Sequence, residues 1–222
     1  GAGKTTLLKC VMRIITGGDG SIAVDGRPLD TYSQRELARI VSYVPQSEGH
    51  PMPFTVEEFL LMGRYPHLSP FTSFTRDDRR VVADALELTG IAALAERRLD
   101  TLSGGERQTA AIAAAVVQGG SVMLLDEPTT FLDPRHESDV LRLIAAINRE
   151  RGITVVSVTH NINAAALNSD RVAILKRGRV VYHGPAGGIM TNDVLGGVYD
   201  RQFRFVAHPD GGPDIIIPEA GR

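Results

Sequence analysis

The chain has 222 residues, enough for one large domain or a domain with a subdomain, and its 43% hydrophobic and 23% charged residues are typical of a soluble globular protein. The formal net charge of -2 leaves no basic excess of the kind that indicates nucleic-acid binding. The longest unbroken apolar run, Ala110–Val117, is far shorter than a membrane span. The single cysteine, Cys10, excludes an internal disulfide and fits a reducing compartment.

The chain begins inside a glycine-rich pattern. Gly3-Lys4-Thr5 matches the end of the phosphate-loop pattern G-x-x-x-x-G-K-[S/T], whose first glycine would lie upstream of Gly1. The glycines allow the backbone to curl around phosphate oxygens, Lys4 can reach the β- and γ-phosphates, and Thr5 can place its hydroxyl on Mg²⁺. A helix over Thr6–Met12 is predicted to follow, with its N-terminus toward the phosphates. Taken alone, so short a match also arises by chance.

A glycine-rich stretch at residues 17–20 is predicted to break this helix. A short strand over Ser21–Val24, a polar helix over Ser33–Arg39 and a strand over Ile40–Val44 are expected to follow. Gln46 comes just after the last of these. It is either an ordinary loop residue or a group that touches Mg²⁺ or the attacking water from a loop.

The composition changes from about residue 47 to residue 101, where turns at prolines separate two predicted helices, Thr55–Arg64 and Thr75–Leu88. This pattern is typical of a helical insertion on a sheet domain. It holds much of the sparse aromatic content of the chain, namely Phe54, Phe59, Tyr65, Phe71 and Phe74. These aromatic side chains form either a small local core or a docking surface for a partner.

A second glycine pair marks the middle of the chain. Ser103 and Glu106 form a capping box, which predicts a helix that continues through Ala110–Val117. One interpretation is a well-capped core helix. However, Gly104 and Gly105 lie in its first turn, where each glycine costs roughly 1 kcal/mol relative to alanine. The pair therefore also suggests that an anion such as phosphate approaches the helix N-terminus closely.

Two acids follow an apolar run. Val122–Leu125 is typical of a strand covered on both faces, as in a parallel sheet, and it leads into Asp126 and Glu127. Open α/β sheets place their chemistry at such strand ends, although adjacent acids are often only a solvated terminus. Ile153–Val158 is predicted to be a second buried strand. His160 follows it and is either structural or placed beside the acids.

The remaining patterns predict smaller elements. Asp133 and Pro134 indicate the start of another helix, with Asp133 as its cap. The last part of the chain is predicted to contain a hairpin over Arg171–Tyr182, a short helix near Asn192–Tyr199, a strand near Phe203–Ala207 and a loosely held tail from Gly211.

Six patterns occur in one order: G-x-G-K-T-T, Gln46, L-S-G-G-E, L-L-D-E-P, F-L-D and His160. Each is weak alone, but together they are very specific. Over essentially its whole length the chain resembles the ATPase subunit of an ATP-binding cassette (ABC) transporter. The resemblance implies an α/β P-loop NTPase fold: a mostly parallel, RecA-like sheet with a helical subdomain at about residues 47–103 and a partial antiparallel β subdomain.

By the same resemblance, residues 1–222 are one ABC ATPase domain whose N-terminal strands are missing from this sequence, together with the aromatic residue that stacks on adenine. ATP is expected between the phosphate loop of one subunit and the signature of a second, in a head-to-tail dimer. The expected ATP-binding residues are Gly1, Ala2, Gly3, Lys4, Thr5 and Thr6 of the loop, Ser103, Gly104 and Gly105 of the signature, and the D-loop acid Asp133.

The resemblance also implies the catalytic and metal-binding roles. Mg²⁺ is expected at Thr5, Gln46 and the Walker B acid Asp126. The expected catalytic residues are the base Glu127, the switch histidine His160, the Q-loop glutamine Gln46 and Lys4.

Within the family, Met62–Phe71 looks like the importer branch that takes up iron–siderophore complexes, haem or cobalamin. The implied function is ATP hydrolysis that powers uptake through separate integral-membrane permease subunits, with a substrate-binding protein as an indirect partner and no nucleic acid. The subunit is expected on the cytoplasmic face of the inner membrane. The transported substrate and the choice between homodimer and heterodimer are left open.

Two other functions are weighed against this one. A non-transport ATPase of the same superfamily, acting on DNA or ribosomes, would carry a long coiled coil before the signature or two cassettes on one chain, and the sequence has neither. A nucleotide-dependent interaction module without turnover would be expected to lack Glu127 or His160, and both are present.

Overall fold

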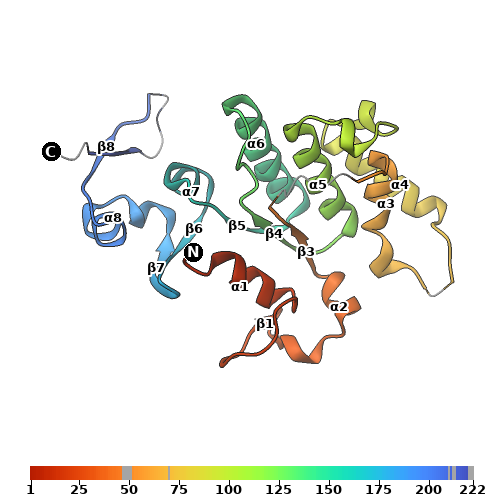
Figure 1. The fold of residues 1–222 in the computed structure, drawn as a ribbon, viewed down its shortest axis with the longest axis horizontal. Coiled ribbons are helices and arrows are strands. Elements are labelled where there is room, and N and C mark those ends of the chain that lie inside the picture. The colour runs from red at the N-terminus through yellow and green to blue at the C-terminus, as the bar shows by residue number, and fades with distance from the viewer. Residues whose placement is uncertain (47–51, 70, 210, 212–213, 220–222) are drawn as a thin grey trace. The chain divides into compact units, whose positions relative to one another are not determined.

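The computed structural model describes residues 1–46, 52–69, 71–209, 211 and 214–219 (Figure 1). The first residues of the predicted helical insertion, 47–51, and one residue of its importer-like stretch, Pro70, lie outside the described part. The chain divides into two compact units. One is Leu8–Val158, and the other combines Gly1–Leu7 with Thr159–Arg222.

A parallel sheet forms the centre of the unit Leu8–Val158. Its strands are β3 (Val41–Val44), β4 (Val122–Asp126) and β5 (Thr154–Val158), with β4 in the middle. Both pairings are parallel, and Val122 of β4 lies opposite Val41 and Thr154. The predicted parallel sheet is therefore confirmed.

Helices cover both faces of this sheet (Figure 1). On one face, Leu124 packs in a core with α2 (Gln34–Ala38) and with the end of α1 (Lys4–Val11) that belongs to this unit. On the other face, Met123 and Leu125 pack against α5 (Gly104–Gln118) and α6 (Pro134–Arg151). Successive side chains of a strand point to opposite faces, so the apolar run of β4 serves both cores.

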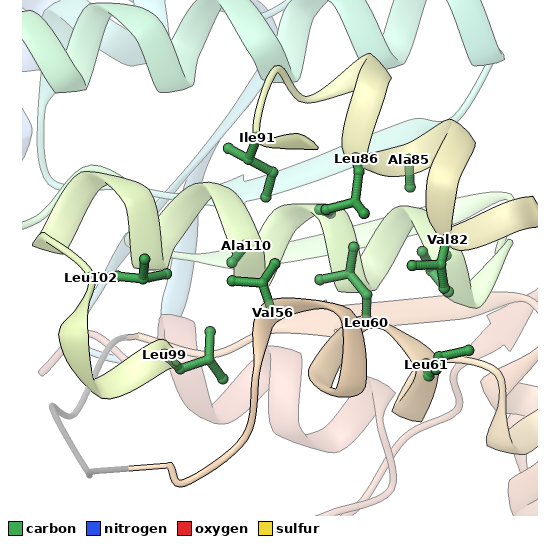
Figure 2. Close-up of a cluster of buried hydrophobic side chains, with 12 residues drawn as sticks. Val56, Leu60, Leu61, Val82, Ala85, Leu86, Ile91, Leu99, Leu102 and Ala110 are labelled. Atoms are coloured by element: carbon green, nitrogen blue, oxygen red, sulfur yellow. The ribbon is translucent and has the colours of Figure 1, made fainter. Parts of the chain in front are cut away.

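A third core lies away from the sheet (Figure 2). Helices α3 (Val56–Met62) and α4 (Arg76–Leu88) pack against α5 through buried side chains such as Leu60 and Leu86. Helix α5 presents Ala110, Ala113 and Val117 to this core and Ile112 and Ala115 to the sheet. Helix α5 is thus shared by both cores. Leu60 of α3 is fully buried in the third core, so we expect Leu60→Ala to lower the free energy of unfolding by about 2–5 kcal/mol.

Local sequence determines where these helices begin. Capping boxes start α2, α3, α4 and α5, and the predicted box Ser103–Glu106 is among them. The predicted strand Ser21–Val24 is shorter than expected. The structure has a small hairpin of β1 (Ala23–Val24) and β2 (Arg27–Pro28), turned by Asp25 and Gly26 at φ 50° and 73°.

The unit formed by residues 1–7 and 159–222 has its own core, which includes the buried Leu195 and Phe203. Its elements are the helices α7 (Ile162–Asn168) and α8 (Asn192–Tyr199) and the strands β6 (Arg171–Lys176), β7 (Arg179–Pro185), β8 (Phe203–Val206) and β9 (Ile215–Pro218). The predicted hairpin is present as the antiparallel pair β6–β7.

The structure corrects two expectations. The tail is not loose throughout, because β9 pairs with β8 and the Asn163 side chain hydrogen-bonds both the N–H and the C=O of Ile216, at 2.7 and 3.0 Å. The second error concerns β5, which the sequence predicts to be covered on both faces. Val156 is 44% exposed and only Val158 of this strand is buried, and among the described residues β5 is an edge strand beside β4.

Candidate functional site

The carboxyl end of β4 holds the first of the predicted acids. Asp126 is 1% exposed and lies opposite Val158 of β5. The hydroxyl of Tyr43, on β3, donates a hydrogen bond to its Oδ2 at 3.3 Å. A buried carboxylate needs such partners, because an unpaired charge in an apolar environment is costly. The parallel register thus places Asp126 where this class of sheet carries its chemistry.

Glu127 follows directly after β4, and both its backbone and its side chain are held by hydrogen bonds. Its φ of 50° is unusual for a residue other than glycine, and its N–H donates to the carbonyl of Val158 at 2.9 Å. Its Oε2 accepts hydrogen bonds from Thr130 Oγ1 at 3.0 Å and from Gln46 Nε2 at 3.4 Å. The structure therefore brings Gln46 and Glu127 together, although they are 81 residues apart in the sequence.

The signature turn forms the N-terminus of α5. Ser103 Oγ accepts from the N–H of Glu106 at 3.3 Å, and Glu106 Oε2 accepts from the N–H of Ser103 at 2.8 Å. The hydrogen bond from the Ser103 backbone lowers the pKa of Glu106 below its usual value. A Cβ at Gly104 would make ordinary contact with Leu132 at 3.8 Å. A Cβ at Gly105 would lie only 2.4 Å from Cδ2 of His136, so Gly105 is also required by packing against α6.

Asp133, the predicted D-loop acid, lies at the start of α6. Asp133 Oδ1 accepts hydrogen bonds from the backbone N–H groups of Arg135 and His136, each at 3.0 Å, and so caps α6. Its Oδ2 lies 2.7 Å from His136 Nδ1. These hydrogen bonds from His136 lower the pKa of Asp133. Nearby, Phe131 is 88% exposed at φ 67°, a strained conformation for an aromatic residue.

The predicted phosphate-loop residues belong to the other unit. Gly3 has φ 90°, and among the described residues no atom beyond the adjacent residues lies within 4 Å of where a Cβ would be at Gly1 or Gly3. Lys4, Thr5 and Thr6 form the first turn of α1, and the N–H of Leu7 bonds the carbonyl of Gly3 at 3.0 Å. Ala2 is half-buried beside them. The open backbone at the glycines fits the close approach of a phosphate group.

His160 belongs to this second unit as well. It stands between Thr159 and Asn161, at the point where β5 gives way to α7. Asn161 caps α7 through a hydrogen bond from the N–H of Ala164 at 3.0 Å, and its own N–H donates to Thr159 Oγ1 at 3.0 Å. The backbone after His160 is therefore held in place by hydrogen bonds.

The predicted metal ligands offer oxygen donors. A threonine hydroxyl, a glutamine amide and one carboxylate, from Thr5, Gln46 and Asp126, are groups that suit Mg²⁺, which takes one or two carboxylates together with phosphates and water. In the part of the chain that the structure describes, no group of three or more His, Cys, Asp or Glu side chains is placed to hold a metal on its own. The donor set fits a magnesium ion held jointly by the protein and a nucleotide.

Part of the importer-like stretch Met62–Phe71 packs against α5 and hydrogen-bonds to it. A Cβ at Gly63 would lie 2.7 Å from the carbonyl of Ala114, so α3 approaches α5 closely there. Arg64 Nη1 donates to the carbonyl of Val117 at 3.0 Å, and His67 Nε2 lies 2.8 Å from the carbonyl of Gln118. Both side chains satisfy carbonyls at the C-terminal end of α5. Tyr65 and Phe71 are exposed.

Residues 1–130 match the family model described as ABC transporter. The chain belongs to the ABC transporter family. Among its relatives, the ferric enterobactin transport ATP-binding protein FepC of Escherichia coli (strain K12) is 37% identical over 98% of this chain and 80% of FepC. The iron(3+)-hydroxamate import ATP-binding protein FhuC of Bacillus subtilis (strain 168) is 39% identical over 98% of this chain and 81% of FhuC. The hemin import ATP-binding protein HmuV of Streptomyces coelicolor is 39% identical over 98% of this chain and 77% of HmuV.

Solved structures of ABC proteins agree in fold. One described as a metal-chelate type ABC transporter in an inward-facing conformation superposes with a TM-score of 0.86 at 27% identity, over 99% of this chain and 83% of that chain. The dimeric cassette MJ0796 bound to ADP and Pi gives a TM-score of 0.67 at 26% identity, over 83% of this chain and 81% of that chain. The predicted family, its importer branch and the P-loop NTPase fold are confirmed, and the chain is an ATP-binding ATPase of the ABC family. The roles of individual residues stay predictions.

Proposed function

We propose that this chain hydrolyses ATP to power an importer of iron–siderophore, haem or cobalamin-type substrates through separate permease subunits. The names of its relatives support the iron-chelate class, because FepC, FhuC and HmuV are named for ferric enterobactin, iron(3+)-hydroxamate and hemin. The observation that carries the enzymatic part is the hydrogen-bonded end of β4. There Glu127 accepts from Gln46 and Thr130, next to the buried Asp126.

Glu127 is proposed as the general base for the attacking water. Its hydrogen bonds from Thr130 and Gln46 converge on Oε2, and its backbone is tied to β5, so the carboxylate is fixed before the substrate arrives. A positioned base typically contributes about 10²–10⁴-fold to the rate. Gln46, bonded to this carboxylate, is proposed to orient the water. His160 is proposed as the switch residue and Lys4 as the cation that balances charge on the transferred phosphoryl group.

Mg²⁺ is proposed to be held by Thr5, Gln46 and Asp126. When bound, the ion neutralises charge on the β- and γ-phosphates. The Tyr43 hydroxyl fixes the orientation of the Asp126 carboxylate, which must present an oxygen toward the metal or its water. The open backbone of Gly1 and Gly3 supports phosphate binding.

A second ATPase subunit is proposed to complete the site in a head-to-tail dimer. Support comes from the dimeric cassette MJ0796, whose fold this chain shares. The signature Ser103–Gly105 would meet the nucleotide bound by the partner's phosphate loop, and Asp133 would lie beside it. The backbone N–H groups at the start of α5 suit an anionic ligand of this kind.

The permease is proposed to dock on the helical part of the chain, around Tyr65. A groove of about 530 Å³ lies there, lined by Phe54, Thr55, Glu57, Glu58, Leu61, Met62, Tyr65, Phe74, Arg79 and Glu96. Its lining combines apolar side chains with three glutamates, and its cationic residue Arg79 is paired with Glu57 at 3.3 Å. This chemistry fits a short cytoplasmic helix of the permease that carries an apolar side chain and a basic one.

No helix in the described ranges is long and apolar enough to cross a membrane. We propose that the subunit sits at the cytoplasmic face of the inner membrane through its permease partners, with the substrate-binding protein engaged only indirectly. The relatives named as ATP-binding proteins of transport systems support this placement.

Steady-state ATP hydrolysis tests the proposal. Glu127→Gln in the full-length protein is expected to lower turnover by about 10²–10⁴-fold while ATP binding is kept. Glu150→Gln, at an exposed position near the end of α6, is the matched control and is expected to leave turnover unchanged. Near-normal hydrolysis by Glu127→Gln would move the base elsewhere, with His160 the next candidate.

A further inference from the structure

The predicted signature turn and the segment that holds Asp133 come together through Leu132, near Gly104, and much more closely through His136, at Gly105. Its Cδ2 would lie 2.4 Å, its Cγ 2.8 Å and its Cβ 3.1 Å from a Cβ built on Gly105. Real Cβ contacts are essentially never as short as the first two, so the imidazole rests against the bare Cα of the signature glycine. No other residue type fits at position 105 unless this ring moves.

The same ring is fixed from its other side by Asp133. Asp133 Oδ1 accepts a hydrogen bond from the backbone N–H of His136 at 3.0 Å, and Asp133 Oδ2 lies 2.7 Å from the ring Nδ1 of His136. An ionised carboxylate only accepts hydrogen bonds, so Nδ1 carries the proton and donates. One side chain therefore links the D-loop acid to the signature glycine by a hydrogen bond on one edge and a close contact on the other.

Core packing does not account for this arrangement. The His136 side chain is 43% exposed and that of Asp133 is 59% exposed, so neither contributes much to the buried core. The signature turn is already fixed by its capping box and by Arg97, whose Nη1 lies 3.5 Å from Glu106 Oε1. What His136 adds is a defined distance between this turn and the start of α6.

We propose that His136 is a positioning residue for ATP hydrolysis, which holds the signature glycines and Asp133 in a fixed register so that both meet the nucleotide of the partner subunit together. The inference rests on the proposed function, in which both turns close over that nucleotide. A misplacement of about 1 Å at a reacting centre can cost roughly 10²-fold in rate, so a contact of this kind has a measurable effect.

Three variants of the full-length protein test the link. His136→Ala removes both contacts and is expected to lower kcat by about 10- to 100-fold with KM changed by less than about threefold, since His136 is not part of the phosphate loop. His136→Asn keeps a donor in the place of Nδ1 and an atom in the place of Cδ2, and is expected to retain kcat within about threefold. Arg135→Ala, which removes an exposed side chain from the same turn, is expected to leave both constants unchanged.

A crossed variant separates the contact with Gly105 from a general loss. Gly105→Ala alone forces its Cβ into the ring and is expected to lower kcat strongly. In the His136→Ala background the same Cβ has room, so Gly105→Ala is expected to cause a clearly smaller additional loss. Losses that simply multiply would overturn the packing link.

Two further measurements keep the test independent of folding and of the proposed function. The melting temperatures of the His136 variants are expected to match the native protein within about 2 °C, because the side chain is partly exposed. Native kcat in His136→Ala overturns this inference alone, as does an equal loss in His136→Asn and His136→Ala. A native protein without ATPase activity overturns the proposed function and this inference with it.

Discussion

The buried ion pair between Arg64 and Asp78 predicts a large effect of either residue on the stability of the protein. The side chains are only 16% and 8% exposed, and Arg64 Nε donates to Asp78 Oδ1 at 2.9 Å. The N–H and the hydroxyl of Thr75 donate to Oδ2 at 2.9 and 2.7 Å, so the carboxylate also forms the cap of α4. We predict that Asp78→Ala destabilises the protein strongly.

The size of the stability loss follows from the charge of Arg64, which Asp78→Ala leaves buried without its partner. Removing one partner of a buried pair leaves the other charge uncompensated and costs about 3–5 kcal/mol. For a chain of this size that corresponds to a fall in melting temperature of roughly 6–20 °C. Asp77→Ala removes a neighbouring acid whose side chain is 85% exposed and lies 3.5 Å from the exposed Arg80, so it is expected to cost less than about 1 kcal/mol.

The pH dependence gives a second measure of the same pair. The hydrogen bond from the Thr75 backbone, followed by that from Arg64, lowers the pKa of Asp78 from its ordinary 3.8 to about 2. A lowered folded-state pKa means that the stabilisation is fully present above about pH 4 and is lost as the pH falls through about 2. The stability difference between the native protein and Asp78→Asn should therefore narrow over that interval.

Thermal or urea unfolding of the full-length variants, followed by circular dichroism, measures these effects. The double variant Arg64→Leu/Asp78→Leu should be more stable than the single losses together predict, because it leaves no unpaired charge. A loss of unfolding free energy in Asp78→Ala that is no larger than the loss in Asp77→Ala would contradict this prediction.

Three other outcomes follow from the site and its surroundings. Lys4→Ala in the full-length protein should abolish ATP hydrolysis, since electrostatic stabilisation of the transferred phosphoryl group is worth about 3–4 kcal/mol. Turnover within about threefold of the native rate would contradict the phosphate-loop assignment. Tyr65→Glu, at a side chain that is 59% exposed, should release the subunit from its permease on co-purification yet leave its isolated ATPase activity unchanged, and a retained complex would refute the docking surface. Phe131→Gly should relieve the backbone strain at φ 67° without lowering the stability of the monomer. It should weaken the ATP-dependent dimer, as measured by analytical ultracentrifugation, because it removes an exposed aromatic ring. An unchanged dimer would show that this ring does not contact the partner.

Local signals in the sequence predict most of the helices and the central strand. The capping boxes at Thr75 and Ser103 are recognisable because each needs only two residues three positions apart. Strand β4 is recognisable because a short apolar run that ends in acids is typical of a strand covered on both faces. The strand β9 escapes prediction because glycines and a proline precede its isoleucines and pairing with β8 stabilises it.

Contacts between distant segments cannot be predicted in the same way. The hydrogen bond from Arg64 to the carbonyl of Val117 spans 53 residues, and nothing local to either residue predicts it. The sequence suggests the approach of an anion as the reason for Gly105, whereas the structure adds a close neighbour, His136, from another helix. Steric requirements of this kind depend on how α5 packs on α6, which a single sequence does not display.

We propose that this chain closes over ATP in a head-to-tail dimer of ATPase subunits and that Glu127 then acts as the base for hydrolysis. Gel filtration of full-length Glu127→Gln with Mg-ATP tests it most directly, beside the same variant carrying Ser103→Arg. Gln keeps the shape of the side chain but removes the base, so ATP should bind without turnover and hold the closed dimer. We expect a dimer for Glu127→Gln and a monomer for the double variant, because a bulky side chain at the signature should block closure. A monomer for Glu127→Gln, or a stable dimer in the double variant, would contradict it.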